Sequence, residues 1–366
     1  MNTEINVNFP NMHIGEFIEK MSIVYKNFLN SNLKLPALML WGSPGVGKSD
    51  GIKAIANNVA KECNKTAAIT DVRLLLYNPV DLRGIPTADE NKEFAKWLKP
   101  KIFNMDNSDD IINFLILDEI TAAPASIQAA AYQIVLDRQI GEHKLPDNCI
   151  VIAAGNQVTD NAVAYKMSKA LCNRMTHIKI TPSVNDWKKW AIRSNIDPRI
   201  IAYINYKGDL ALFNFEPKSQ DNAFPTPRTW EMVNNYLKIS KLDDCKFMID
   251  GTIGLGTSTE FYTYCKIFNK LPNIQEIVDG KNKTYFNKPD INYALQSAIV
   301  NYCINNVNKI TDDRIKNILN YAIDMEPEFA ILLIRDLVCI NNLNLNSKIL
   351  NSEAWIPFAN KYNTML

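Results

Sequence analysis

Short, nearly all-apolar runs alternate with amphipathic stretches from Pro36 to Ile180. Such runs are typical of parallel strands that helices cover on both faces. Apolar residues at helical spacing predict helices within Lys48–Lys61 and Ser126–Leu136. We therefore expect a doubly wound α/β domain with a parallel five-stranded sheet. The predicted strands are Ala37–Trp41, Ala67–Leu76, Phe114–Leu117, Cys149–Ala154 and Thr176–Ile180.

After Pro182 the strand pattern stops, and the remaining sequence has helical periodicity. A polar loop at 216–227 and a linker at 279–289 interrupt it. The stretch Pro327–Ile340 is apolar nearly all round, which indicates a buried core helix with proline in its first turn. The pattern predicts three domains: an α/β core with an N-terminal helix at 1–182, a helical domain at 183–280 and a second helical domain at 281–366.

Composition and charge exclude several classes of protein. Apolar residues make up 47% of the chain, and 40 Lys and Arg oppose 39 Asp and Glu, for a formal charge of +1. This balance disfavours a tail-type nucleic-acid binder, although a local basic channel stays open. No apolar run reaches the ~18 residues of a membrane-spanning helix. The polar start, Met1–Pro10, does not resemble a signal peptide.

The cysteines and histidines give no metal pattern. The seven cysteines are scattered and never form CxxC, and the three histidines are isolated. We therefore expect buried thiols in a reducing compartment, a cytoplasmic protein and no zinc site.

A glycine-rich segment follows the first predicted strand and opens the next predicted helix. It matches GxxxxGK[ST], and its glycines allow backbone N–H groups to surround phosphate oxygens at a helix N-terminus. Lys48 would reach the β- and γ-phosphates, and the Ser49 hydroxyl would bind Mg²⁺. The alternative is a plain turn before a helix. The segment predicted to bind the nucleotide is Gly42, Ser43, Pro44, Gly45, Val46, Gly47, Lys48 and Ser49.

Two carboxylates follow the apolar run 114–117. A parallel strand delivers such side chains to the edge of the sheet where ligands bind. Asp118 would hold Mg²⁺ through water, and Glu119 would act as the general base toward the attacking water. The alternative is that both acids cap the next helix. A base that activates water favours hydrolysis over transfer to another acceptor.

Three further polar residues are candidates for the same site. Asn156 ends a buried run and would bond the attacking water or the γ-phosphate, although Gly155-Asn156 also suits a turn. Arg174 would be an arginine finger for a neighbouring subunit, or simply a cation at a helix C-terminus. Arg228 falls in the first turn of a helix that begins Thr226-Pro227, where the dipole disfavours a cation, so we expect it to contact nucleotide phosphates rather than only solvent.

In order and spacing, these residues resemble an AAA+ ATPase over about residues 36–240. Walker A corresponds to 42–49, Walker B to 115–119, sensor 1 to Asn156, the arginine finger to Arg174 and sensor 2 to Arg228. The resemblance implies a P-loop core followed by a helical lid at 183–280, with the C-terminal helical domain added to it. ATP and Mg²⁺ are the implied ligands.

More narrowly, the chain resembles the MoxR branch. Asp118-Glu119-Ile120 followed by Ala123-Pro124-Ala125 is similar to that branch, as are expected hairpins at 79–98 and 137–148. Thr121-Ala122 replaces the usual Asn-Arg pair. The hairpins would face the pore or axial surface of a ring, although ordinary connecting loops are the alternative.

The leading hypothesis is a ring-forming ATPase that remodels a protein partner, because Arg174 has no evident partner in its own chain. The resemblance implies a homo-oligomeric, hexameric ring and a separate partner with a von Willebrand factor A domain. The alternative is an AAA+ nucleic-acid motor or loader, which the neutral charge disfavours and the lysines at 92, 96, 99 and 101 keep open. A nucleotide-dependent scaffold with little turnover is the third hypothesis.

Overall fold

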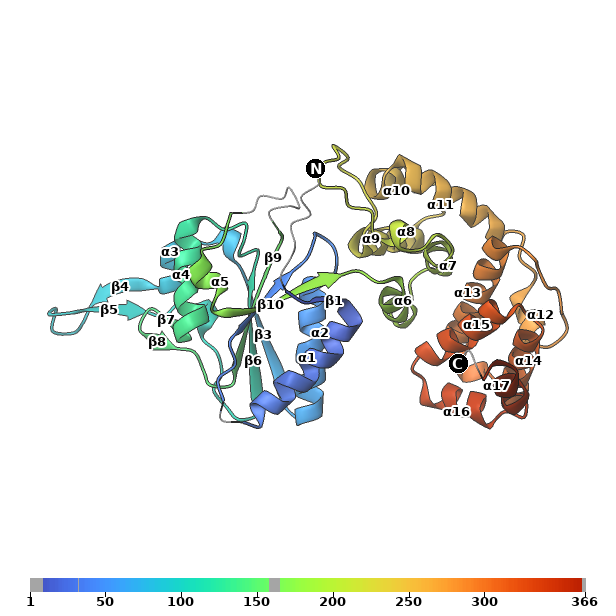
Figure 1. Ribbon diagram of the computed structural model, residues 1–366, viewed down its shortest axis with the longest axis horizontal. Helices are drawn as coiled ribbons and strands as arrows, with labels where there is room; N and C mark the ends of the chain where they lie inside the picture. Colours follow the sequence, from blue (N-terminus) through green and yellow to red (C-terminus); the bar gives the residue numbers. More distant parts are fainter. Residues whose placement is uncertain (1–8, 32, 158–164, 364–366) are drawn as a thin grey trace. The chain divides into compact units, whose positions relative to one another are not determined.

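The computed structural model describes residues 9–31, 33–157 and 165–363. The chain divides into two compact units, residues 1–181 with 216–219 and residues 182–215 with 220–366 (Figure 1). The first eight residues, most of the polar start that is not expected to be a signal peptide, lie outside the described part. No helix in the described ranges is long and apolar enough to cross a membrane.

The first unit is built on a six-stranded sheet in which all neighbouring strands are parallel. Its spatial order is β1-β10-β2-β9-β6-β3. Every residue of β9 is buried, as a near-continuous apolar run in a parallel sheet requires. The strands are β1 (Asn11–His13), β2 (Ala37–Trp41), β3 (Thr66–Arg73), β6 (Ile111–Asp118), β9 (Cys149–Gly155) and β10 (Met175–Thr181).

All five predicted strands are present, with two differences. The third run leaves the sheet at Arg73, and its last residues form a 3-10 turn, Leu74–Leu76. The sheet also gains a sixth strand, β1, which pairs with β10. No sequence pattern indicated β1, because this segment is short and mostly polar and its pairing rests on backbone hydrogen bonds, such as Lys179 N–H to the Pro10 carbonyl.

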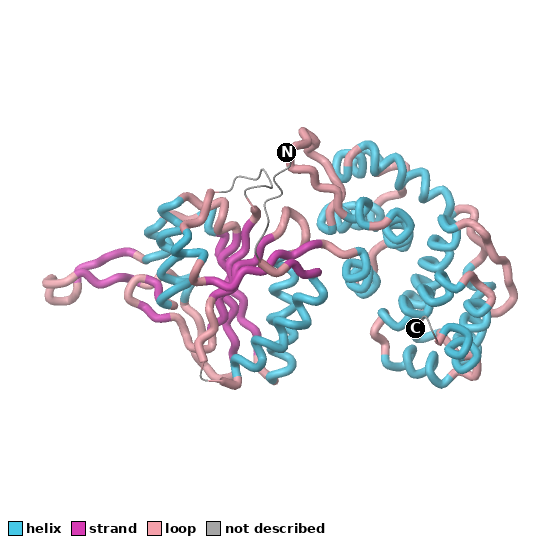
Figure 2. The backbone as a smooth tube through the Cα atoms, viewed as in Figure 1, coloured by secondary structure: helices cyan, strands magenta, loops and turns pink. Residues whose placement is uncertain are grey.

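Helices cover both faces of the sheet (Figures 1 and 2). Alternate residues of each strand point to opposite faces, so Leu115 and Leu117 join the core beneath α4, whereas Phe114 meets Tyr25 of α1 edge to face. Helices α1 and α2 pack together on that second face. The helices are α1 (Ile14–Leu29), α2 (Lys48–Cys63), α3 (Pro79–Arg83), α4 (Ala125–Asp137) and α5 (Lys169–Cys172), with a 3-10 turn at Lys101–Phe103.

The hairpin expected at 137–148 is confirmed as the antiparallel ribbon of β7 (Gln139–Ile140) with β8 (His143–Lys144). The one expected at 79–98 is a ribbon only from Ile85 onward, β4 (Ile85–Ala88) with β5 (Ala95–Leu98), because Pro79–Arg83 forms the short helix α3, with proline in its first turn and Gly84 after its end. The two ribbons are joined: the His143 ring nitrogen Nε2 lies 2.8 Å from the Trp97 carbonyl oxygen. Gly141 has φ +55°, and a Cβ there would lie 2.6 Å from the Arg83 carbonyl. The ribbons therefore form one composite projection (Figure 1).

The second unit is helical, and one cluster of buried apolar side chains runs from Trp187 to Tyr362. This core includes residues on both sides of the boundary expected at 280, and the three-domain division stays a prediction. The helices are α6 (Val184–Arg193), α7 (Pro198–Lys207), α8 (Asp209–Leu212), α9 (Pro227–Ile239), α10 (Lys246–Ile253), α11 (Leu255–Phe268), α12 (Ile274–Val278), α13 (Pro289–Asn305), α14 (Asp312–Ile323), α15 (Pro327–Cys339), α16 (Leu343–Asn351) and α17 (Trp355–Tyr362), with a 3-10 turn at Val307–Lys309.

Candidate nucleotide-binding site

The glycine-rich segment forms the turn between β2 and α2, at the carboxyl edge of the sheet. Gly45 and Gly47 have φ values of +79° and +90°, a region that side chains with a Cβ disfavour. Helix α2 begins at Lys48, so the unpaired N–H groups of its first turn face the loop. Loop and helix together supply backbone donors and a positive dipole end, which suit an anion such as a phosphate group.

Lys48 connects this loop to the end of β9. Its Nζ donates hydrogen bonds to the carbonyl oxygens of Gly42 and Ser43, at 2.6 and 3.1 Å, and to Oδ1 of Asn156 at 2.9 Å. The structure therefore brings together the lysine and the asparagine that the sequence predicts for one site. In this arrangement the lysine is held by acceptors that a phosphate oxygen can replace.

Ser49 and Asp118 are also brought together. The Ser49 hydroxyl donates to Oδ2 of Asp118 at 3.2 Å, although the two residues come from different elements. A hydroxyl and a carboxylate are oxygen donors of the kind Mg²⁺ prefers, and Mg²⁺ commonly keeps several waters and takes its other ligands from substrate phosphates. The described residues contain no cluster of three or more His, Cys, Asp or Glu that would hold a metal by themselves. The donor pair thus fits Mg²⁺ bound together with a nucleotide.

Glu119 has an unusual backbone. Its φ is +56°, in the left-handed region that non-glycine residues seldom adopt, and its N–H donates to Oδ1 of Asp118 at 2.8 Å. Strain of this kind is concentrated at functional positions. The turn leaves the Glu119 side chain exposed, without a hydrogen-bond partner among the described residues, and therefore open to a water molecule.

Thr121 positions the predicted sensor, a role that the sequence did not reveal. Its Oγ1 accepts the Asn156 N–H at 3.1 Å. A Cβ on Gly155 would lie 2.6 Å from the same hydroxyl oxygen, so the close approach depends on glycine. The hydroxyl at 121 therefore sets the direction in which the chain leaves β9.

Asp71 and Arg73 also lie at this edge, and no sequence motif indicated them. Strand β3 lies beside β6, and the register pairs Arg73 with Asp118. Partial desolvation, and then the negative charge of Asp118, raise the pKa of Asp71. Both residues alternate with buried Val72 on the strand, but only the strand order shows that they lie next to the Walker B carboxylate.

Arg174 lies two residues beyond α5 and has neutral partners in its own chain. Its guanidinium stacks 5.0 Å from the centre of the Tyr132 ring, and Nη1 donates to the Ala170 carbonyl at 2.7 Å. The expectation that it has no partner in its own chain was therefore wrong. No described carboxylate pairs with it, however, so its charge is not neutralised there.

Arg228 belongs to the helical unit. It is the second residue of α9, which begins at Pro227 and is capped by the Thr226 hydroxyl, an acceptor for the Thr229 N–H at 3.1 Å. The predicted cap and first-turn proline are confirmed. The Arg228 side chain is exposed and forms no ion pair with a described residue, and its role toward a nucleotide stays a prediction.

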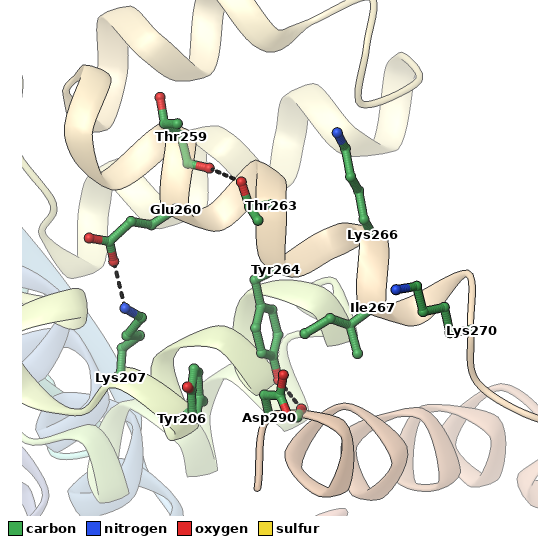
Figure 3. Close-up of a pocket in the computed structure, with 10 residues that line it drawn as sticks. All are labelled: Tyr206, Lys207, Thr259, Glu260, Thr263, Tyr264, Lys266, Ile267, Lys270 and Asp290. Carbon is green, nitrogen blue, oxygen red and sulfur yellow. Dashed lines mark hydrogen bonds and ion pairs between the residues drawn. The ribbon is translucent and has the colours of Figure 1, made fainter. Parts of the chain in front are cut away.

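A separate concavity of about 520 Å³ lies wholly within the helical unit (Figure 3). Its aromatic wall is formed by Tyr206 and Tyr264, whose rings stack at 5.6 Å. Lys207 and Glu260 form an ion pair of 2.8 Å at its rim. None of its lining residues belongs to the predicted nucleotide motifs. They are Tyr206, Lys207, Thr259, Glu260, Thr263, Tyr264, Lys266, Ile267, Lys270 and Asp290.

Comparison with known sequences finds one family whose model matches the segment that carries the nucleotide motifs. The family model described as "ATPase family associated with various cellular activities (AAA)" matches residues 37–177. This match spans the phosphate loop, both Walker B carboxylates, Asn156 and Arg174. A comparison with curated proteins returns no significant match.

Solved structures that match this chain include the Aeropyrum pernix ORC2 protein, at 14% identity over 76% of this chain and 75% of that one, with a TM-score of 0.39. NtrX from Brucella abortus in complex with ADP has 13% identity over 90% and 68%, with a TM-score of 0.39. The Thermotoga maritima RuvB Holliday junction branch migration motor has 14% identity over 94% and 87%, with a TM-score of 0.33. Superpositions this loose define neither a substrate nor a partner for this chain.

Proposed function

We propose that this chain hydrolyses ATP at the interfaces of a ring and thereby remodels a protein partner; the match of residues 37–177 to the model of the ATPase family associated with various cellular activities supports this proposal. The match supports an ATP-hydrolysing enzyme of the AAA+ type, and such ATPases typically use Mg²⁺ and assemble into oligomeric rings. The hexameric ring, the chaperone-like role, the MoxR-type partner with a von Willebrand factor A domain and the cytoplasmic location belong to the proposal.

The observation that carries the proposal is the convergence of four polar side chains at one edge of the sheet. Lys48 contacts Asn156, and Ser49 contacts Asp118. In the proposed reaction Lys48 binds the β- and γ-phosphate oxygens. Ser49, and Asp118 through water, would hold Mg²⁺, and the ion would supply positive charge next to the phosphates. Glu119 accepts a proton from the attacking water, and Asn156 orients that water or the γ-phosphate.

Arg174 is proposed to complete the site of the next subunit. It lies outside the cluster formed by Lys48 and Asp118 and carries a charge that no described carboxylate neutralises. An arginine supplied in trans stabilises the charge that develops on the transferred phosphoryl group. Arg228 is proposed to contact the nucleotide phosphates from the helical unit and to couple hydrolysis to movement of that unit.

The joined hairpins support a protein client. Ile85 and Leu98 pair across the β4–β5 ribbon and are 59% and 52% exposed, and Phe94 near the turn is 73% exposed. Exposed apolar side chains on a projecting ribbon suit contact with apolar segments of a protein. A second candidate function, a nucleic-acid motor or loader, is favoured by the four lysines from Lys92 to Lys101 near the same ribbon.

The test combines assembly, turnover and capture. Native mass measurement with and without ATP gives the ring size, and Glu119→Gln should bind ATP but hydrolyse it about 10²- to 10⁴-fold more slowly. Pulldown from the source cell with this variant should retain a protein that Lys48→Ala does not retain. ATPase stimulation by DNA that disappears as salt rises would instead support the nucleic-acid motor. If the wild type hydrolyses ATP no faster than Glu119→Gln, the proposed enzyme function is wrong.

A further inference from the structure

A chain of hydrogen bonds links β2 to α5 through one histidine. Trp41 Nε1–H donates to Nδ1 of His177 at 2.9 Å. The Nε2 atom of the same ring lies 2.7 Å from the Cys172 carbonyl oxygen. Because Nδ1 must accept the indole proton, the ring proton belongs on Nε2, which then donates to that carbonyl. One neutral tautomer of His177 thus satisfies both contacts.

The first end of this chain is attached to the phosphate loop. Trp41 is the last residue of β2, and Gly42, the first residue of the loop, follows it directly. The Gly42 N–H donates to the Gly155 carbonyl, and a Cβ on Gly42 would lie 3.1 Å from the Ile180 carbonyl. The backbone at Gly42 is therefore enclosed by β9 and β10. Because Trp41 precedes Gly42 directly, a displacement of Gly42 also moves the Trp41 ring.

The other end is attached to the segment that carries Arg174. Helix α5 has four residues, too few to be stable by its own hydrogen bonds. The Ser168 hydroxyl caps its first turn by accepting the Leu171 N–H, and His177 satisfies the carbonyl of Cys172 at its end. Arg174 bonds back to Ala170 of the same helix. The position of the guanidinium therefore follows the position of α5.

We propose that Trp41 and His177 are positioning residues for Arg174, and that they couple the phosphate loop of one subunit to the arginine that this subunit offers to its neighbour. The inference rests on the proposed function, because it requires Arg174 to act in trans. It adds a route within one subunit by which a change in the conformation of the phosphate loop alters the rate of hydrolysis at the neighbouring subunit's site, which Arg174 completes.

The aromatic contacts separate this role from simple packing. Trp41, Phe9 and His177 form a cluster of three rings: the Trp41 centre lies 5.9 Å from Phe9 and 6.0 Å from His177, and the Phe9 and His177 centres are 5.7 Å apart. A phenylalanine at position 41 retains a ring beside both neighbours but has no N–H to donate. Trp41→Phe therefore removes the link to His177 and leaves the aromatic stack in place. His177→Phe removes both hydrogen bonds and serves as the second variant.

The test uses mixed rings. A Glu119→Gln subunit should hydrolyse ATP only very slowly at its own site, but its Arg174 is intact. We expect Trp41→Phe rings to have a kcat lower by about tenfold to 100-fold, with an unchanged KM for ATP, because a misplaced group of this kind costs turnover rather than binding. Mixing with Glu119→Gln subunits should restore turnover at the Trp41→Phe sites, since an intact arginine then completes them. His177→Phe should behave in the same way.

The reference mixture contains Arg174→Ala and Glu119→Gln subunits. Trp190→Phe, a change at an exposed tryptophan of the helical unit, is a separate matched control for assembly and turnover. If Arg174→Ala is rescued by mixing but neither Trp41→Phe nor His177→Phe is, these residues act on their own loop and the inference is wrong. The inference is also wrong if Trp41→Phe and His177→Phe both retain full turnover. If Arg174→Ala itself is not rescued, the arginine does not act in trans, and that part of the proposed function fails first.

Discussion

Lys48 Nζ donates a hydrogen bond to Oδ1 of Asn156 over 2.9 Å, although 108 positions separate the two residues. The contact joins the start of α2 to the end of β9, and it places a cation and an amide on the same side of the phosphate loop. A phosphate oxygen that binds Lys48 will therefore also lie within reach of Asn156.

Asn156→Ala should slow hydrolysis more than it weakens binding. The amide is expected to act on the attacking water or the γ-phosphate, so its loss should lower kcat by about 10²-fold, as for other single polar groups that stabilise a transition state. Lys48 retains its contacts with two carbonyls and should still hold the nucleotide. Steady-state kinetics and an ATP-binding titration measure the two effects. A large rise in the dissociation constant with unchanged kcat would contradict the assigned role.

Asp71→Asn should stabilise the first unit at neutral pH. Partial desolvation and the charge of Asp118 raise the pKa of Asp71 in the folded state, so its ionisation opposes folding. That destabilisation is complete above the raised folded pKa and is absent below the unfolded value of about 3.9. The gain from Asp71→Asn, less than about 1 kcal/mol for a partly solvated group, should therefore fade as the pH falls through this window. Thermal unfolding at several pH values checks it; a constant gain would argue against an electrostatic cause.

Lys188→Met should destabilise the helical unit strongly. Lys188 Nζ lies 2.8 Å from Oδ1 of Asp336, and both side chains are almost completely buried. Burial lowers the pKa of Lys188 and raises that of Asp336, while the charge of each partner opposes the shift of the other. Removing one partner leaves an uncompensated buried charge and costs about 3–5 kcal/mol.

Urea unfolding of the full chain measures this loss. The double variant Lys188→Met/Asp336→Leu should recover most of it, because no charge then remains buried. Lys316→Met, which breaks the exposed pair with Glu353, is the matched control and should leave the midpoint unchanged. Equal losses in the two single lysine variants would show that the buried pair has no special role.

Gly141→Ala should loosen the contact between the two hairpins. Its φ is +55°, and the added Cβ would lie 2.6 Å from the Arg83 carbonyl, so both strain and a backbone clash oppose alanine. We expect a loss of at least about 1 kcal/mol by thermal unfolding. Gly251→Ala is the control: this glycine lies in α10, and a Cβ there would meet no neighbouring atom within 4 Å, so alanine should be neutral or stabilising. If Gly141→Ala left the thermal stability unchanged, the two ribbons would not be held together by this close contact.

The sequence alone determined the features that depend on neighbouring residues. Gly42–Ser49 specifies its turn and the start of α2 because glycine conformations and a helix N-terminus are local properties. The apolar runs lie within strands, and the most buried one, β9, is continuous because a parallel strand covered on both faces requires it. The third run is the exception in extent, since its last residues, Leu74–Leu76, form a 3-10 turn. Thr226-Pro227 likewise began a helix, as its residue types favour.

Tertiary structure alone decided what depends on strand order and register. The pairing of β3 with β6 places Arg73 opposite Asp118, and the pairing of β10 with β2 brings His177 to Trp41. No local pattern specifies which strands become neighbours, because the strand order depends on how the helices pack on both faces of the sheet. For the same reason the short polar strand β1 had no sequence signal: its stability comes from the edge of β10, which exists only after the sheet has formed.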